Sequence, residues 1–253
     1  MGRRVVALLA SASALAGTCL LLAPLAGAAQ PGGPAATGAG AGAVAATLSN
    51  LKTLSRWAYA QAEAPVHAQP SALSPVIGRL GFLTPEGQAA VYLALRSLKD
   101  GAAAWVLVPL PGPSNRARGW VEAGALGELH LTREYLRVDR EALKATLYRD
   151  GHAIWRAPVG VGRSSLPTPA GHFYVTEKLM GMGIPLYGPY ALGTSAYSPR
   201  LREWPGGGVV GIHGTDEPQL LPGRVSHGCI RLRNPDILRL ARLMPVGTPV
   251  TVR

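Results

Sequence analysis

The chain has 253 residues, of which 47% are hydrophobic, and a formal net charge of +11. This length allows one large domain or two smaller ones, and the 32 glycines and 22 prolines favour turns and short strands over a mainly helical protein. The positive charge favours an anionic polymer as partner, but the basic residues form no runs, so nucleic acid is not expected.

Residues 1–28 have the three-part pattern of a secretory signal peptide. Arg3 and Arg4 form a positively charged start, residues 5–25 are almost entirely apolar, and small residues up to Ala28 offer a cleavage site. The apolar run is long enough to span a bilayer, so an uncleaved anchor is the alternative. The pattern predicts an exported protein of the extracytoplasmic cell envelope, in the periplasm or cell wall, which contacts the membrane only if the signal is retained.

Residues 29–63 are predicted to form a linker and a short helix. Up to residue 46 the segment has no charge and consists mainly of Ala, Gly and Pro, which is typical of a flexible linker. Leu48, Leu51 and Leu54 then recur at helical spacing, so we expect a short amphipathic helix over residues 47–63.

Residues 64–127 contain several short apolar segments, among them VIGRL and AAWVLVPLP, separated by Pro, Gly and Ser. This pattern predicts a small all-β barrel. The order of VHAQPS, VIGRL, a strand with Trp105 and the GWV of residues 119–121 resembles the bacterial Src-homology-3-like domain. That resemblance implies binding of wall peptides, and a spacer or docking module is the alternative.

The second folded part is expected at residues 130–253 and to be mainly β. Residues 145–149 and 152–159 alternate around Asp150-Gly151, a dipeptide favoured in two-residue hairpin turns. Residues 172–178 predict another strand, and the Gly-, Pro- and Tyr-rich residues 179–208 predict a long functional loop without periodicity.

The C-terminal part of the sequence predicts two further strands and one helix. The segment GGVVGIH predicts a strand that ends at His213. Asn234, Pro235 and Asp236 predict the start of a helix, with Asn234 as N-cap and Pro235 at the first helical position. ILRLARLM fills this helix, Pro245 ends it, and TPVTVR predicts a final strand.

The stretch VSHGCIRLRN holds Cys229, the only cysteine besides Cys19 in the predicted signal. Thr18 precedes Cys19, where a lipoprotein signal usually has Gly or Ala, so lipid attachment is the less favoured alternative. After cleavage Cys229 would have no partner for an intramolecular disulfide. It is then either a buried apolar residue or a chemically active thiol.

The residues around Cys229 fit a nucleophile. A thiol needs a nearby base, because only a small fraction is thiolate at neutral pH, and His213 and His227 are candidates. Gly228 leaves room for a substrate, and the amides of Gly228 and Cys229 can stabilise an oxyanion. A zinc site of these two histidines and Cys229 is the alternative, but it has no fourth ligand, so no metal or other cofactor is expected.

IHGT followed by SHGCIRL resembles the signature of the L,D-transpeptidase catalytic domain family, and GVGRSSLPTPAGHFYVTE resembles an earlier segment of that family. The similarity covers residues 130–253. It implies a mainly β fold: a catalytic β-sandwich with few helices that follows the small barrel.

The resemblance implies a role for individual residues. Cys229 would be the nucleophile, His213 the general base and acid, and the backbone carbonyl of Gly214 would orient His213. The implied oxyanion and substrate-binding residues are Ser226, His227, Gly228, Arg231 and a loop tyrosine such as Tyr197; the sequence does not decide between Tyr197, Tyr187 and Tyr190.

The implied activity is an acyl transfer in peptidoglycan through a Cys229 thioester, which cross-links the third residues of two stem peptides. The resemblance leaves the acceptor open, since water would make the protein an L,D-carboxypeptidase and a protein amine would make it a protein-to-wall transferase. A non-catalytic wall-binding protein is a further alternative.

Overall fold

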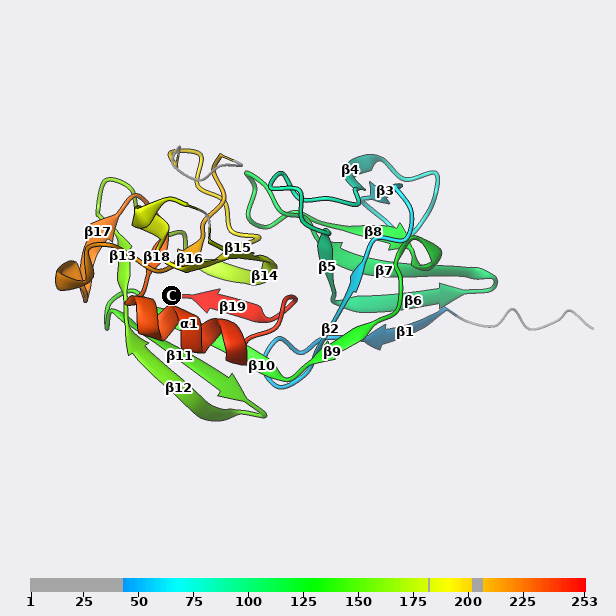
Figure 1. Ribbon diagram of the computed structural model, residues 1–253. Helices are drawn as coiled ribbons and strands as arrows, with labels where there is room; N and C mark the ends of the chain where they lie inside the picture. Colours follow the sequence, from blue (N-terminus) through cyan, green and yellow to red (C-terminus); the bar gives the residue numbers. More distant parts are fainter. Residues whose placement is uncertain (1–42, 182, 202–206) are drawn as a thin grey trace, which may run out of the picture. The chain divides into compact units, whose positions relative to one another are not determined.

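The computed structural model describes residues 43–181, 183–201 and 207–253 (Figure 1). The predicted signal peptide and nearly all of the predicted linker lie outside these residues. Within the described part of the chain, no helix is long and apolar enough to cross a bilayer.

The described residues are mainly β, as expected, with a single α-helix among them. The N-terminal half forms a six-stranded sheet in the order β1-β6-β7-β8-β3-β4 and a three-stranded sheet in the order β5-β2-β9. The elements of this half are β1 Val44–Thr47, β2 Ser55–Tyr59, β3 Ala64–His67, β4 Val76–Leu80, β5 Val91–Ala94, β6 Arg96–Asp100, β7 Ala103–Pro109, β8 Arg118–Glu122, the 3-10 helix η1 Ala123–Ala125 and β9 His130–Thr132. The resemblance to a Src-homology-3-like domain stays a prediction.

The predicted helix over residues 47–63 is wrong, because β1 ends and β2 lies within that range. Asn50 Oδ1 accepts hydrogen bonds from the amides of Lys52, Thr53 and Leu54 at 2.9, 2.9 and 3.1 Å. Leu51 has a φ of 61°, which a right-handed helix does not allow. The asparagine side chain thus builds a tight turn at the place where the leucine spacing predicted a helix.

The C-terminal half forms a ten-stranded sheet in the order β12-β11-β10-β19-β14-β15-β16-β18-β13-β17. The predicted hairpin around Asp150-Gly151 is confirmed, since both residues have the positive φ, 49° and 80°, that its turn requires. The elements of this half are β10 Glu134–Asp139, β11 Lys144–Arg149, β12 His152–Pro158, β13 Gly160–Gly162, β14 Gly171–Met180, η2 Pro185–Tyr187, β15 Tyr190–Thr194, β16 Ile212–His213, η3 Pro218–Leu220, β17 Gly223–Ser226, β18 Ile230–Arg231, α1 Asn234–Leu243 and β19 Pro249–Val252.

The long loop predicted over residues 179–208 is only partly a loop. Strand β14 continues to Met180, and β15 lies between β14 and β16 in the sheet. Four of the five residues of β15 are buried, so the strand lacks the alternation of polar and apolar residues by which a half-buried strand is recognised.

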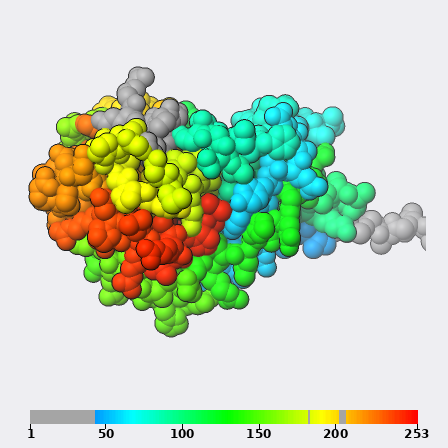
Figure 2. All heavy atoms as spheres, in the orientation of Figure 1, coloured from blue at the N-terminus to red at the C-terminus, as the bar shows by residue number. Residues whose placement is uncertain are grey.

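The helix α1 covers the core of this half. Ile237, Leu240 and Ala241 are buried in a core that also contains Leu192 and Ile212, and the helix forms part of the surface in Figure 2, in red. The predicted helix is confirmed, but Asn234 is its first helical residue and makes no side-chain cap; the N-cap is Arg233.

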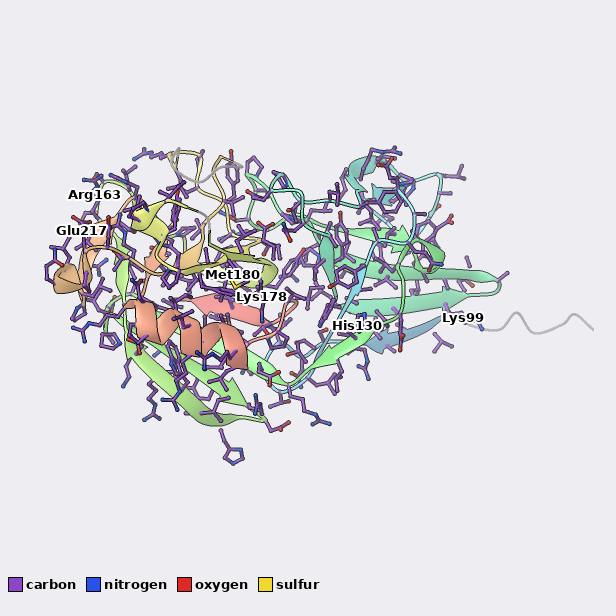
Figure 3. All side chains as sticks on the ribbon, viewed as in Figure 1. Lys99, His130, Arg163, Lys178, Met180 and Glu217 are labelled. Carbon is purple, nitrogen blue, oxygen red and sulfur yellow. The ribbon has the colours of Figure 1, made fainter. Side chains whose placement is uncertain are left out.

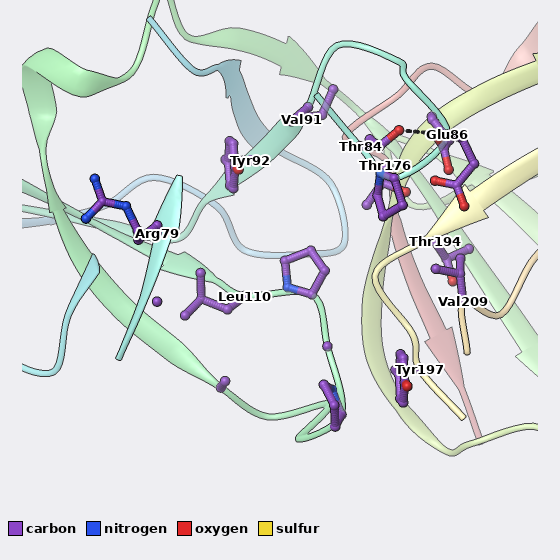
Figure 4. Close-up of a pocket in the computed structure, with 18 of the residues that line it drawn as sticks. Arg79, Thr84, Glu86, Val91, Tyr92, Leu110, Thr176, Thr194, Tyr197 and Val209 are labelled. Carbon is purple, nitrogen blue, oxygen red and sulfur yellow. Dashed lines mark hydrogen bonds between the residues drawn. The ribbon is translucent and has the colours of Figure 1, made fainter. Parts of the chain in front are cut away.

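Strand β14 also contacts the N-terminal half. The Tyr174 hydroxyl donates to the Val91 carbonyl at 3.1 Å, and Thr84 Oγ1 donates to Glu177 Oε2 at 2.6 Å. Glu177 is 2% exposed and lines a cavity of about 520 Å³ beside Glu86 (Figure 4). Burial, with a further contribution from the negative charge of Glu86, raises the pKa of Glu177 to about 7.

This raised pKa makes folding sensitive to a rise in pH from 4.5 to about 7. Glu177 is protonated in the folded chain over a range in which the unfolded chain has lost that proton, so its stabilising effect is present below pH 4.5 and is lost as the pH rises through about 7. We expect Glu177→Gln to reduce the loss of stability between pH 5.5 and pH 8.5 in urea unfolding. The exposed Glu128→Gln is the control; equal pH dependence in wild type and Glu177→Gln would contradict the assignment.

Candidate active site

Two short strands bring Cys229 and His213 together. Strands β16 and β18 are parallel neighbours in which Ile212 pairs with Ile230 and His213 pairs with Arg231. The Ile230 amide donates to the Gly211 carbonyl at 2.9 Å, and the Gly211 amide donates to Cys229 Sγ at 3.4 Å. Cys229 therefore lies level with Gly211, two residues before His213 on the adjacent strand.

This register places the thiol and the imidazole on one face of the sheet. Side chains alternate between the two faces of a strand, so residues two apart share a face. His213 and Cys229 are diagonal neighbours, and such pairs have Cα atoms about 7–8 Å apart, within reach of side chains of this length. The predicted nucleophile and base thus lie on neighbouring strands and on the same face, although 16 residues separate them in the chain.

The imidazole of His213 is held in one orientation inside the protein. Its side chain is 1% exposed, and Nδ1 lies 2.6 Å from the Gly214 carbonyl oxygen. A carbonyl accepts only, so Nδ1 carries the proton and Nε2 keeps its lone pair. The ring of Tyr187 meets the imidazole edge to face, with ring centres 4.8 Å apart. The carbonyl of Gly214 thus makes the contact with His213 that the family resemblance implies.

Burial keeps His213 neutral. Desolvation is the largest effect on the pKa of His213, the hydrogen bond to Gly214 opposes it, and the positive charge of Arg231 adds to it, so that together they lower the pKa to about 4. At neutral pH the ring is therefore able to accept a proton at Nε2.

Ser226 organises the turn that carries Cys229. Its hydroxyl donates to the Cys229 carbonyl at 2.6 Å and accepts from the Gly228 amide at 3.1 Å. Gly228 has a φ of 134°, a conformation that favours glycine, and the partly buried His227 lies between these two residues. An oxyanion role for the Gly228 amide would require that its bond to Ser226 be exchanged for one to the substrate.

Arg231 is buried beside His213 and forms an ion pair with Glu217, a partner that the sequence does not single out. Its Nη1 lies 3.0 Å from Glu217 Oε2. Figure 3 shows Glu217 on the left side of the view. Within the described residues, the buried Nε of Arg231 has no hydrogen-bond partner.

The structure assigns the loop tyrosines to different places. Tyr187 contacts His213, whereas the backbone of Tyr197 pairs with the Asn115 side chain and its aromatic ring packs against Gly208. Tyr197 lines the cavity of Figure 4. Tyr187 is therefore the tyrosine next to the proposed base. The sequence of this Gly- and Tyr-rich segment has no periodicity from which its position could be predicted.

A search of residues 43–253, without the gaps at 182 and 202–206, finds no group of three His, Cys, Asp or Glu side chains placed to bind a metal ion.

Comparisons with known proteins agree with this geometry. The L,D-transpeptidase catalytic domain family matches residues 133–252. YkuD of Bacillus subtilis is 33% identical over 118 residues, 47% of this chain and 65% of that protein. YqjB of the same organism is 31% identical over 126 residues, 47% of this chain and 70% of that protein; both carry L,D-transpeptidase names.

A solved structure is also similar to part of this chain. The catalytic domain of the Enterococcus faecium L,D-transpeptidase is 29% identical, with coverage of 47% of this chain and 95% of that one and a TM-score of 0.38. The chain thus spans a little under two thirds of YkuD, and the matches cover about half of the chain. On the family match and the YqjB relative together, this chain belongs to the L,D-transpeptidase family.

Proposed function

We propose that the chain is an exported peptidoglycan L,D-transpeptidase that forms a thioester on Cys229. The observation that carries the proposal is the shared face of Cys229 and His213, with the imidazole held as the Nδ1–H tautomer by Gly214. The acyl donor would be a stem peptide that ends in a D-amino acid after its third residue. The signal pattern of residues 1–28 supports a site of action in the cell envelope.

The first half of the reaction forms the acyl-enzyme. His213 Nε2 accepts the proton of the Cys229 thiol, and the sulfur attacks the carbonyl carbon of the third stem residue. A tetrahedral oxyanion forms, for which the Cys229 amide is a candidate donor. The C–N bond to the terminal D-alanine then breaks, and the imidazolium of His213 returns its proton to the leaving amine.

The second half transfers the acyl group. The amine of a neighbouring stem attacks the thioester and loses a proton to His213, the C–S bond breaks, and the thiolate recovers that proton. The low pKa of the resting imidazole is compatible with these steps, because a thiolate beside it stabilises the imidazolium that proton transfer creates. Arg231, which is buried and paired with Glu217, braces the motif around Cys229.

The acceptor separates this proposal from its alternatives on the same fold. Incubation with purified muropeptides that carry tetrapeptide stems should give cross-linked dimers. Tripeptides without dimers would favour a carboxypeptidase, and neither product from a folded sample would favour a non-catalytic wall-binding protein.

A carbapenem tests the nucleophile directly. We expect a stoichiometric covalent adduct on Cys229 in intact-protein mass spectrometry, because a β-lactam carbonyl is a reactive analogue of the acyl donor. Cys229→Ala should give no adduct. Ser226→Ala is a comparison variant, which keeps the thiol but loosens the turn that carries it. A folded wild-type protein without adduct would count against the proposal.

His213 should also make folding sensitive to acid. A base whose pKa is lower in the folded chain binds protons preferentially when unfolded, so stability is fully present above pH 6.5 and is lost as the pH falls toward about 4. From pH 7 to pH 4.5 this amounts to about 2 kcal/mol. We expect His213→Asn to lose this part of the acid sensitivity in urea unfolding, whereas the exposed His172→Asn keeps it; identical curves for both variants would exclude a buried neutral His213.

A further inference from the structure

The side chain of Asn234 leaves its own helix and binds the loop after His213. Asn234 is the first residue of α1 and caps no helical amide. Its Oδ1 instead accepts a hydrogen bond from the Thr215 amide at 2.9 Å. Thr215 is 1% exposed, so without Asn234 this amide would be buried and lose its acceptor, which destabilises the loop.

Two glycines make room for this side chain. A Cβ on Gly214 or on Gly188 would overlap Asn234 Oδ1, and a Cβ on Gly188 would also lie 2.8 Å from the Gly214 Cα. Gly188 has a φ of 63°, which other residues rarely adopt. The backbones of these two loops therefore approach each other closely around the Asn234 carboxamide.

Both loops contact the imidazole of His213. The Gly214 carbonyl accepts the His213 Nδ1 proton, and Tyr187, the residue before Gly188, meets the ring edge to face. The side chain of Asn234 thus contacts both of the loops that hold the imidazole, the one with Gly214 and the one with Tyr187.

The Gly214 carbonyl and the Thr215 amide belong to the same peptide group. That group is planar and rigid, so a hydrogen bond to its N–H fixes the direction of its C=O. Hydrogen bonds in series also polarise one another. The series runs from His213 Nδ1–H to the Gly214 carbonyl and from the Thr215 amide to Asn234 Oδ1.

We propose that Asn234 is a positioning residue of the active site, which acts on His213 through the peptide group between Gly214 and Thr215. It takes the place of a side-chain acid by fixing and polarising the carbonyl that selects the Nδ1–H tautomer. The proposal rests on His213 as the base of the proposed function. Its described hydrogen bond goes to the Thr215 amide and not to the thiol.

The test compares Asn234→Ala with Asn234→Asp, which keeps an acceptor oxygen. We expect the alanine variant to acylate with a carbapenem about 10-fold or more slowly at saturation, since misplaced catalytic groups cost rates of this order, with little change in the concentration that gives half the maximal rate. Asn234→Asp should recover most of the rate. The control is Asn50→Ala, which removes a side-chain acceptor of three amides in the N-terminal half and should leave acylation unchanged.

A readout in the resting protein separates this proposal from the proposed function. In ¹⁵N NMR of the histidine rings, wild type and Asn234→Asp should show His213 as the Nδ1–H tautomer, and folded Asn234→Ala should show a mixture. If the alanine variant fails to fold, Asn234→Leu fills the space between the glycines without an acceptor and should give the same mixture. A pure Nδ1–H tautomer with wild-type acylation in either folded variant would overturn the role of Asn234, whereas no acylation by wild type would reject the proposed function alone.

Discussion

The active site depends on the parallel pairing of β16 with β18. Each strand has two residues, and the pairing alone sets the offset between His213 and Cys229. A slip of one residue would turn His213 to the opposite face. Ile212 and Ile230 prevent this slip, because each is at most 1% exposed and packs in the core. The apolar core therefore determines the geometry of the polar groups.

In the candidate active site, backbone groups make most of the contacts with the proposed catalytic residues. The Gly214 carbonyl orients the base, the Gly211 amide contacts the sulfur, and Ser226 ties two backbone atoms of the Cys229 turn. Backbone atoms cannot leave with a rotamer change, so a site built from them is already organised before substrate arrives. Such a site needs glycine where backbones must approach closely, and substitution at Gly214 would disturb the base itself.

Much of this architecture could be predicted from local signals. The hairpin at Asp150-Gly151, the strand ending at His213 and the helix after Asn234 each have a short-range cause in turn or helix chemistry. The SHGC motif pointed to Cys229 as the candidate nucleophile because its residues are contiguous in the chain.

The predictions from sequence failed where tertiary contacts outweigh the local pattern of polar and apolar residues. Asn50 builds a turn inside a helix-like leucine spacing, and β15 is buried on both faces, so it shows no alternation. Asn234 has an ordinary helix-start sequence, yet its oxygen binds an amide 19 residues earlier. Tyr187 and Glu217 reach His213 and Arg231 only through the folded loops, for which the sequence carries no periodic signal.

The position of β19 has a consequence for how the sheet assembles. This strand lies between β10, to which it is parallel, and β14, to which it is antiparallel. Until residues 249–252 have been synthesised, the meander of β10, β11 and β12 and the remaining strands have no common edge to join. Contacts over more than a hundred residues then have to form at once, which is typical of slowly folding topologies, so the catalytic half matures as a unit and not strand by strand.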